Sequence, residues 1–127
     1  MAHRSRLGGF IIDCQDTDAD TGARFWSAAL GYPAASSYSE LGAEYAELQG
    51  TPAGLHVEVQ RVDHPSRVHL DIESDDIEAE VARLERLGAR RIGFVKRWWV
   101  MEAPTGHRFC VVKMSDPDAG APPNIWD

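Results

Sequence analysis

The stretch that decides the fold reads Val68-His-Leu-Asp-Ile-Glu-Ser-Asp-Asp-Ile-Glu-Ala-Glu-Val-Ala-Arg-Leu-Glu-Arg-Leu-Gly88. Its first five residues alternate between apolar and polar, which predicts a β-strand over 68–72 with one buried face. Ile77, Val81 and Leu84 then recur at helical spacing, so we expect a helix over 75–87. Asp75 is the expected N-cap, with Glu78 completing a capping box, and Gly88 ends the helix.

The same order of signals occurs earlier in the chain. Phe10-Ile-Ile-Asp-Cys-Gln-Asp16 is followed by Arg24-Phe-Trp-Ser-Ala-Ala-Leu-Gly31, which again reads as a strand, an acidic turn and a helix ending in Leu-Gly. Two turns, Thr51-Pro-Ala-Gly54 and Ala103-Pro-Thr-Gly106, each precede a further strand. We therefore expect one domain over 1–127 made of two βαβββ modules. The expected ranges are modules 7–62 and 66–114, a tail 115–127 without regular structure pinned by Trp126, a first helix 20–30, and strands 7–14, 36–41, 44–48, 55–61, 68–72, 90–95, 98–101 and 108–113.

The composition disfavours several classes of protein. The 127 residues include 20 acidic and 13 basic side chains, a formal net charge of −7, which argues against binding to nucleic acid or to an anionic membrane surface. No apolar run approaches the roughly 20 residues of a membrane span. Cys14 and Cys110 lack the spacing of a disulfide or zinc motif, so we expect thiols and a cytoplasmic location.

Alternation also assigns residues to the two faces of the predicted sheet. The face with Val68, Leu70 and Ile72 is expected to meet the helices. The opposite face mixes isoleucine, valine and cysteine with histidines and carboxylates, and one of two adjacent tryptophans must share it. Its residues are Ile11, Asp13, His56, Glu58, Gln60, His69, Asp71, Arg108, Cys110, Val112, and Trp98 or Trp99. An apolar lining with a few convergent polar groups is typical of a small-molecule pocket. The alternative is an ordinary half-buried sheet whose polar face meets water.

Four segments in this order resemble one known superfamily: Arg24-Phe-Trp-Ser-Ala-Ala-Leu-Gly-Tyr32, Val68-His-Leu-Asp-Ile72, Arg83-Leu-Glu-Arg-Leu-Gly-Ala89 and Pro104-Thr-Gly-His-Arg-Phe-Cys-Val-Val112. They are similar to the glyoxalase-like branch of the vicinal oxygen chelate superfamily, the glyoxalase/bleomycin-resistance/dioxygenase grouping. The resemblance implies an α+β fold in which two tandem βαβββ modules form a curved mixed sheet around a cup, with helices on the outer face. It also implies a small-molecule ligand in the cup and a homodimer.

Catalytic members of that superfamily hold a divalent metal on His, Gln and Glu side chains from the first and last strand of each module. The resemblance places Ile11, Glu58, His69 and Cys110 at these positions. Glu58 and His69 are therefore the candidate catalytic residues and metal ligands, for zinc, nickel, iron or manganese. Ile11 cannot bind a metal and Cys110 offers a thiol, so the usual ligand set is broken. The candidate ligand-binding residues are His56, Gln60, Asp71, Trp98, Trp99 and Cys110.

Two functions from different classes follow from these residues. In the first, a metal on Glu58 and His69 polarises the oxygens of a small substrate while a carboxylate moves a proton, as in a lyase, isomerase or dioxygenase. In the second, the cup binds or sequesters a small molecule, such as a drug, without a metal. A metal-free lyase or isomerase that uses Glu58 and His69 as acid and base is a third possibility.

Overall fold

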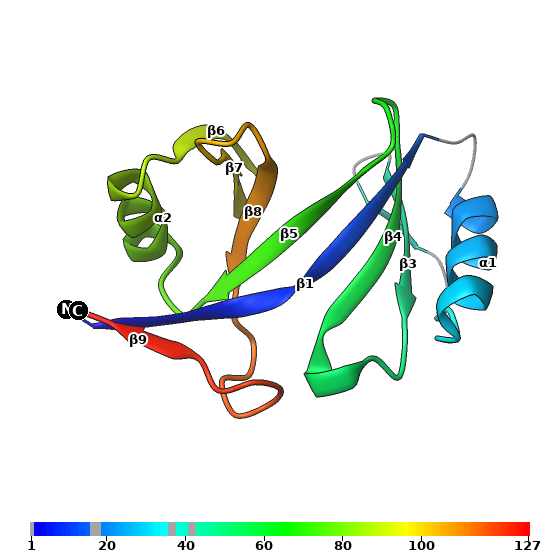
Figure 1. The fold of residues 1–127 in the computed structure, drawn as a ribbon, viewed down its shortest axis with the longest axis horizontal. Helices are drawn as coiled ribbons and strands as arrows, with labels where there is room; N and C mark the ends of the chain where they lie inside the picture. Colours follow the sequence, from blue (N-terminus) through cyan, green and yellow to red (C-terminus); the bar gives the residue numbers. More distant parts are fainter. Residues whose placement is uncertain (1, 16–18, 36–37, 41–42) are drawn as a thin grey trace. The chain divides into compact units, whose positions relative to one another are not determined.

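The computed structural model describes residues 2–15, 19–35, 38–40 and 43–127. The chain divides into two compact units, which we call unit one (Met1–Gly9 with His69–Asp127) and unit two (Phe10–Val68). The elements in chain order are β1 (His3–Gln15), α1 (Ala19–Leu30), β2 (Tyr38–Glu40), β3 (Ala43–Leu48), a short 3-10 turn (Pro52–Gly54), β4 (His56–Val62), β5 (Arg67–Ser74), α2 (Ile77–Arg86), β6 (Arg90–Val95), β7 (Trp98–Glu102), β8 (Arg108–Lys113) and β9 (Asn124–Trp126), as drawn in Figure 1.

Unit one is a mixed sheet with one helix packed on it. Its strands follow the order β9, the first part of β1, β5, β8, β7 and β6. The β5–β8 pair is parallel, whereas β8–β7, β7–β6 and β1–β9 are antiparallel. The amphipathic helix α2 packs mainly on β6, β7 and β8, and its apolar side closes a core made of Val81, Leu84, Met101, Phe109 and Val111.

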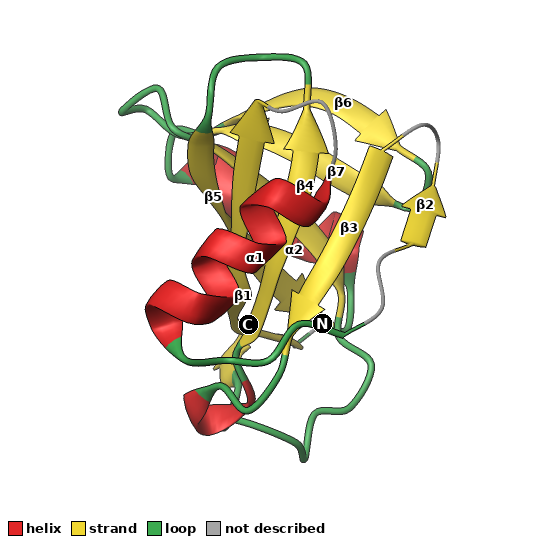
Figure 2. Cartoon of the chain, turned by 90° about the vertical axis from the view of Figure 1, so that its right-hand side faces the viewer, coloured by secondary structure: helices red, strands yellow, loops and turns green. Residues whose placement is uncertain are grey.

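Unit two repeats the plan around α1. Strands β2, β3 and β4 are antiparallel neighbours, and the second part of β1 follows β4. Figure 2 shows α1 lying across the face of β3 and β4, which are also the strands that it contacts. The core on this side of the sheet consists of Leu48, Val57 and Val59, with Phe10, Ile12, Cys14, Trp26 and Tyr32 packed around it.

The predicted fold class is confirmed, because the described chain is α+β with a mixed sheet and one helix in each unit. Gly31 and Gly88 follow the two helices at φ +78° and +105°, the left-handed backbone that the Leu-Gly endings predicted. The predicted turn residue Asp16 and the predicted strand ends Ser36 and Leu41 lie outside the described residues. None of the described helices is long and apolar enough to span a membrane.

Three local predictions were wrong. The N-cap of α2 is Asp76, whose carboxylate accepts a hydrogen bond from the backbone N–H of Ala79. Val68 and Leu70 are 58% and 44% exposed, since α2 packs mainly on β6 to β8 and leaves this part of β5 uncovered. The tail is not wholly irregular, because β9 pairs with the start of β1.

The predicted anchoring of the tail is nevertheless confirmed. The indole N–H of Trp126 donates a 2.8 Å hydrogen bond to Oγ of Ser5, and the guanidinium of Arg83 lies 3.9 Å from the centre of the Trp126 ring. The Arg6 guanidinium also donates hydrogen bonds to the carbonyl oxygens of three tail residues, Asp116, Pro117 and Ala121. The tail is thus fixed to unit one at two places.

Candidate functional site

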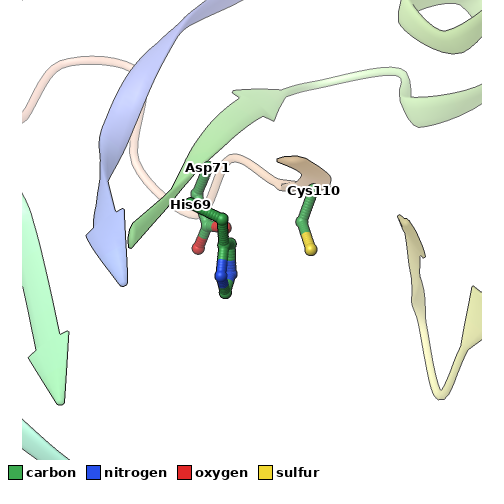
Figure 3. Close-up of side chains that lie close together, drawn as sticks. All are labelled: His69, Asp71 and Cys110. Carbon is green, nitrogen blue, oxygen red and sulfur yellow. The ribbon is translucent and has the colours of Figure 1, made fainter. Parts of the chain in front are cut away.

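In unit one, His69, Asp71 and Cys110 lie close together. Their potential ligand atoms, one from each side chain, all fall within 4.8 Å of one another. Nε2 of His69 lies 3.6 Å from Oδ1 of Asp71. Figure 3 shows the imidazole and the Asp71 carboxylate on β5 and the Cys110 thiol on β8 extending from the same side of the two strands. We call these three residues the HDC cluster.

The pairing of two strands places the cluster. His69 and Asp71 are two residues apart on β5, so their side chains point to the same face of the sheet. Asp71 is the register partner of Cys110 in the parallel β5–β8 pair, which puts the thiol beside the carboxylate. The neighbours of Cys110 in sequence, Phe109 and Val111, belong to the core under α2. The cluster therefore lies on the face opposite the helix, as the alternation predicted.

The environment of the cluster is partly buried and partly apolar. The side chains of His69 and Asp71 are 15% and 16% exposed, and Cys110 is buried. Val100 is the antiparallel partner of Cys110 on β7, so it shares that face, and Trp98 shares it two residues earlier. The face thus combines an imidazole, a carboxylate and a thiol with apolar neighbours.

The two adjacent tryptophans point in opposite directions, and Trp99 lies on the helix side. Its indole N–H donates a 2.8 Å hydrogen bond to Glu78 of α2, and its ring packs edge-on against Phe94. The guanidinium of Arg91 also lies over the Trp99 ring. Of the two predicted ligand-binding tryptophans, only Trp98 is on the face of the HDC cluster.

In unit two, Glu58 is the buried member of a second group. Its Oε1 lies 3.1 Å from Nε2 of His56, which must be the donor because a carboxylate only accepts. Nδ1 of the same imidazole lies 3.5 Å from a carboxylate oxygen of Glu47 on β3. The Glu58 side chain is 9% exposed, whereas His56 and Glu47 are 40% and 50% exposed. Glu58 is therefore a buried carboxylate connected through an imidazole to a carboxylate in solvent.

Three further residues of unit two, Gln60, Ile11 and Asp13, were predicted to share the face of Glu58. Gln60 donates a long 3.4 Å hydrogen bond to the hydroxyl of Tyr45 on the paired strand. Ile11 is 4% exposed and offers only hydrocarbon. Asp13 is equally buried and lies 3.9 Å from the guanidinium of Arg67. Glu58 and His69, the two predicted catalytic residues, belong to different units.

The HDC cluster offers three kinds of chemistry on one face. A histidine can donate or accept a proton near neutral pH, a carboxylate can hold a cation or orient the imidazole, and a thiolate is a soft metal ligand. Sequence reasoning placed His69 among the metal ligands but assigned Asp71 only to ligand binding. The i, i+2 spacing on one strand was the available signal that these two residues share a face. Their proximity to Cys110 depends on the β5–β8 register, for which the sequence carries no comparable signal.

Comparison with known proteins gives the family of the chain. The family model described as "Glyoxalase-like domain" matches residues 9–112, which is most of the sequence. No protein with curated annotation is significantly similar to the sequence.

Three solved structures illustrate the shared fold. A hypothetical protein from Bacillus halodurans C-125 is 12% identical, with a TM-score of 0.66 over 88% of this chain and 96% of its own. Methylmalonyl-CoA epimerase from Mycobacterium tuberculosis is 15% identical, with a TM-score of 0.64 and coverage of 87% and 88%. A variant of the Streptomyces coelicolor methylmalonyl-CoA epimerase in complex with 2-nitronate-propionyl-CoA is 18% identical, with a TM-score of 0.61 and coverage of 87% and 98%. At these identities the likeness establishes the fold alone.

Proposed function

Because the chain belongs to the family of glyoxalase-like domains, we propose that it binds a small molecule on the face of unit one that carries the HDC cluster. The observation that supports this proposal is the convergence of His69, Asp71 and Cys110 within 4.8 Å on the face opposite α2. Small-molecule sites combine an apolar lining with a few convergent polar groups. Trp98 and Val100 supply the apolar part on the neighbouring strand.

Within this proposal we favour a lyase or isomerase. His69, Asp71 and Cys110 would hold a divalent ion, which would supply Lewis-acid polarisation of a substrate oxygen. The Cys110 thiol makes an oxygen-activating iron site of the dioxygenase type a poor match, since those sites use two histidines and a carboxylate. The role of Glu58 in proton transfer stays a prediction from the sequence, because Glu58 belongs to unit two and is described there only as a buried carboxylate hydrogen-bonded by His56.

The second candidate is a binding or sequestering protein that works without a metal. It is supported by the same partly apolar face, which needs no ion to enclose a flat molecule against Trp98. The two candidates differ in one measurable property, since the affinity of the first for an oxygen-rich ligand depends on a divalent ion and that of the second does not.

The location of the ligand is tested by nuclear magnetic resonance on the 127-residue chain. A library of small oxygen-containing fragments, with methylmalonyl-CoA added because the fold neighbours are named for it, is screened by amide chemical-shift changes. We expect the binding fragments to shift the amides of residues 69, 71, 100 and 110. A shallow groove beside α1 of about 370 Å³, lined by small residues with Asp20 and Arg24, is the competing position. Fragments that map to that groove would overturn the proposal.

A pair of histidine variants controls for nonspecific effects. His69→Ala is expected to weaken the binding of these fragments at least tenfold, which corresponds to roughly 1.4 kcal/mol. His64→Ala is the matched control, because His64 is a histidine of unit two whose contact is with the neighbouring Pro65 carbonyl. Equal loss of binding in the two variants would contradict a role for His69.

The cellular setting and the assembly form part of the same proposal. We infer a cytoplasmic protein, supported by two cysteines that are thiols rather than disulfide partners of one another. We also infer a homodimer, which the resemblance to the superfamily implies.

A further inference from the structure

Building on the small-molecule site, we propose that His69, Asp71 and Cys110 form a zinc site that is carried entirely by unit one. This ligand set differs from the one that the family resemblance implies. Of the four expected positions, Ile11 has no donor atom and Glu58 belongs to unit two. Asp71, which is not among the four, lies 3.6 Å from His69 and beside Cys110.

The separations suit a small ion. Zinc–nitrogen and zinc–oxygen bonds near 2.0–2.2 Å and a zinc–sulfur bond near 2.3 Å place neighbouring tetrahedral ligands roughly 3.3–3.6 Å apart. The Nε2–Oδ1 separation of 3.6 Å between His69 and Asp71 already lies at the end of this range. The upper limit of 4.8 Å for the remaining separations leaves about 1 Å to be closed by side-chain rotation.

The chemical types of the three donor atoms in the HDC cluster favour one metal over the others. Calcium and magnesium prefer sites made of oxygen ligands, and this cluster has a single carboxylate. A thiolate and an imidazole favour zinc among the common divalent ions. Three protein ligands leave the fourth tetrahedral position for water or a substrate oxygen, which is the arrangement of catalytic rather than structural zinc sites. The zinc site and the proposed ligand site would then be the same place.

The strand backbone holds the three ligands of the HDC cluster in place more rigidly than a loop would. All three ligands lie inside strands, at positions fixed by the i, i+2 spacing and by the β5–β8 register. Sites on strands hold their geometry more closely than sites on loops. Phe109 and Val111 lie on either side of Cys110 in β8 and belong to the core. They fix the orientation of the Cys110 backbone.

Cobalt and zinc binding to the 127-residue chain tests the proposal. Cobalt(II) bound to a thiolate gives a near-ultraviolet charge-transfer absorption, so we expect this band to saturate at one ion per chain and to disappear when zinc is added. Cys110→Ser removes the band and weakens zinc binding by more than the roughly 10–100-fold that is lost when only an outer-shell partner of a ligand is removed. Asp71→Asn weakens zinc binding and keeps the band.

The chain offers a matched control for each variant. Cys14→Ser leaves the band unchanged, because Cys14 packs against the core of unit two. Asp63→Asn is the control for Asp71→Asn. It leaves zinc binding unchanged, because the Asp63 carboxylate is 90% exposed and lies outside the HDC cluster. Zinc K-edge absorption of the unmodified protein gives an independent measure that requires no variant, with one sulfur neighbour expected near about 2.3 Å.

Three results would overturn the zinc site. They are the absence of saturable cobalt or zinc binding, equal zinc affinity in Cys110→Ser and the unmodified protein, and loss of zinc in Glu58→Gln with retention in Asp71→Asn. The fragment experiment decides the proposed function separately. Fragments that map to the HDC cluster in a protein that binds no zinc would leave the small-molecule site standing and remove only the zinc.

Discussion

Glu80 is a fully buried carboxylate on α2 that is held by hydrogen bonds from three side chains. The guanidinium of Arg83 donates to both of its oxygens, at 2.8 and 2.9 Å, and Nε2 of His3 donates to Oε1 at 2.8 Å. Burial by itself would raise the pKa of the Glu80 carboxyl, but hydrogen bonds from Arg83, His3 and Ser5 outweigh it and lower this pKa from 4.5 to about 2. Glu80 is therefore ionised inside the protein at any physiological pH.

We predict that Glu80 makes the free energy of unfolding depend on pH in the acidic range. A carboxyl whose pKa is lowered in the folded state stabilises it fully above the unfolded pKa of 4.5, and this stabilisation is lost as the pH falls towards about 2. The pKa difference between the unfolded and the folded state corresponds to about 3 kcal/mol in the free energy of unfolding. Urea unfolding of the wild type and of Glu80→Gln should differ by about this much at pH 7, and the two curves should converge as the pH falls from 4.5 towards 2.

Glu85→Gln is the control for this prediction. Glu85 is an exposed residue of the same helix that pairs with Arg91, and such surface pairs contribute about 0–1 kcal/mol. A Glu80→Gln protein as stable as Glu85→Gln at pH 7 would show that the buried network does not stabilise the fold.

A single aspartate also explains why one helix boundary was predicted wrongly. Asp75 accepts a hydrogen bond from the backbone N–H of Arg4 and pairs with its guanidinium, both at 2.8 Å. These contacts, the backbone hydrogen bond first, hold the pKa of the Asp75 carboxyl below its usual value. With Asp75 turned towards Arg4, the adjacent Asp76 caps the helix instead. Both residues have the chemistry of an N-cap, and only the contact with a distant strand distinguishes them.

At the scale of elements, helix α2 shows how periodicity sorts buried from exposed positions. Val81 and Leu84 are buried in the core of unit one, whereas Leu87, at the C-cap, is 66% exposed. Leu87 follows Leu84 by three residues and so lies at the edge of the same helical side, but the structure leaves it in solvent.

The two leucines therefore predict unequal costs of truncation. Leu84→Ala should lower the free energy of unfolding by about 2–4 kcal/mol, because it leaves a cavity against Met101 and Phe109. Leu87→Ala should lower it by less than about 0.5 kcal/mol. Chemical denaturation of both variants checks this, and comparable losses would mean that Leu87 is buried in solution, for instance in an assembly.

Strand β9 is an element that local pattern did not reveal. Its three residues follow a segment rich in proline and alanine, which has no strand signal of its own. It forms because the edge of β1 offers unpaired backbone groups and because Trp126 reaches Ser5 and Arg83. A strand that depends on its partner in this way is predictable only once the partner is placed.

At the scale of the whole molecule, we predict that the chain forms homodimers. The resemblance to the superfamily motivates this prediction, and the tail provides a residue to test it. Trp126 packs within its own chain, but Ile125 beside it is 71% exposed, and large apolar groups in this position favour burial against another surface.

Sedimentation equilibrium measures the assembly directly. We expect a dimer for the wild type and a shift towards monomer for Ile125→Asp, since a buried carboxylate in an interface is costly. The control is Val95→Asp, at a 38% exposed position of the edge strand β6, which should leave the dimer intact. A monomeric wild-type protein would contradict the prediction.

The sequence by itself determined the two helices, the strands other than β9, and the faces of those strands. The alternation in β5 and the helical spacing of Ile77, Val81 and Leu84 are local properties, and each follows from short-range geometry alone. For the same reason the sequence placed His69, Asp71 and Cys110 on the face opposite the helix. The repeated order of signals, together with the quoted motifs, predicted the family that the comparison then confirmed.

The tertiary structure decided which of these residues meet. The parallel register of β5 and β8 places Asp71 beside Cys110, and the contact of Asp75 with Arg4 moves the helix cap by one residue. Pairing between strands distant in the chain depends on the packing of the whole unit, so no local pattern specifies it. The HDC cluster is therefore a product of strand register, although each of its members could be assigned to its face from the sequence.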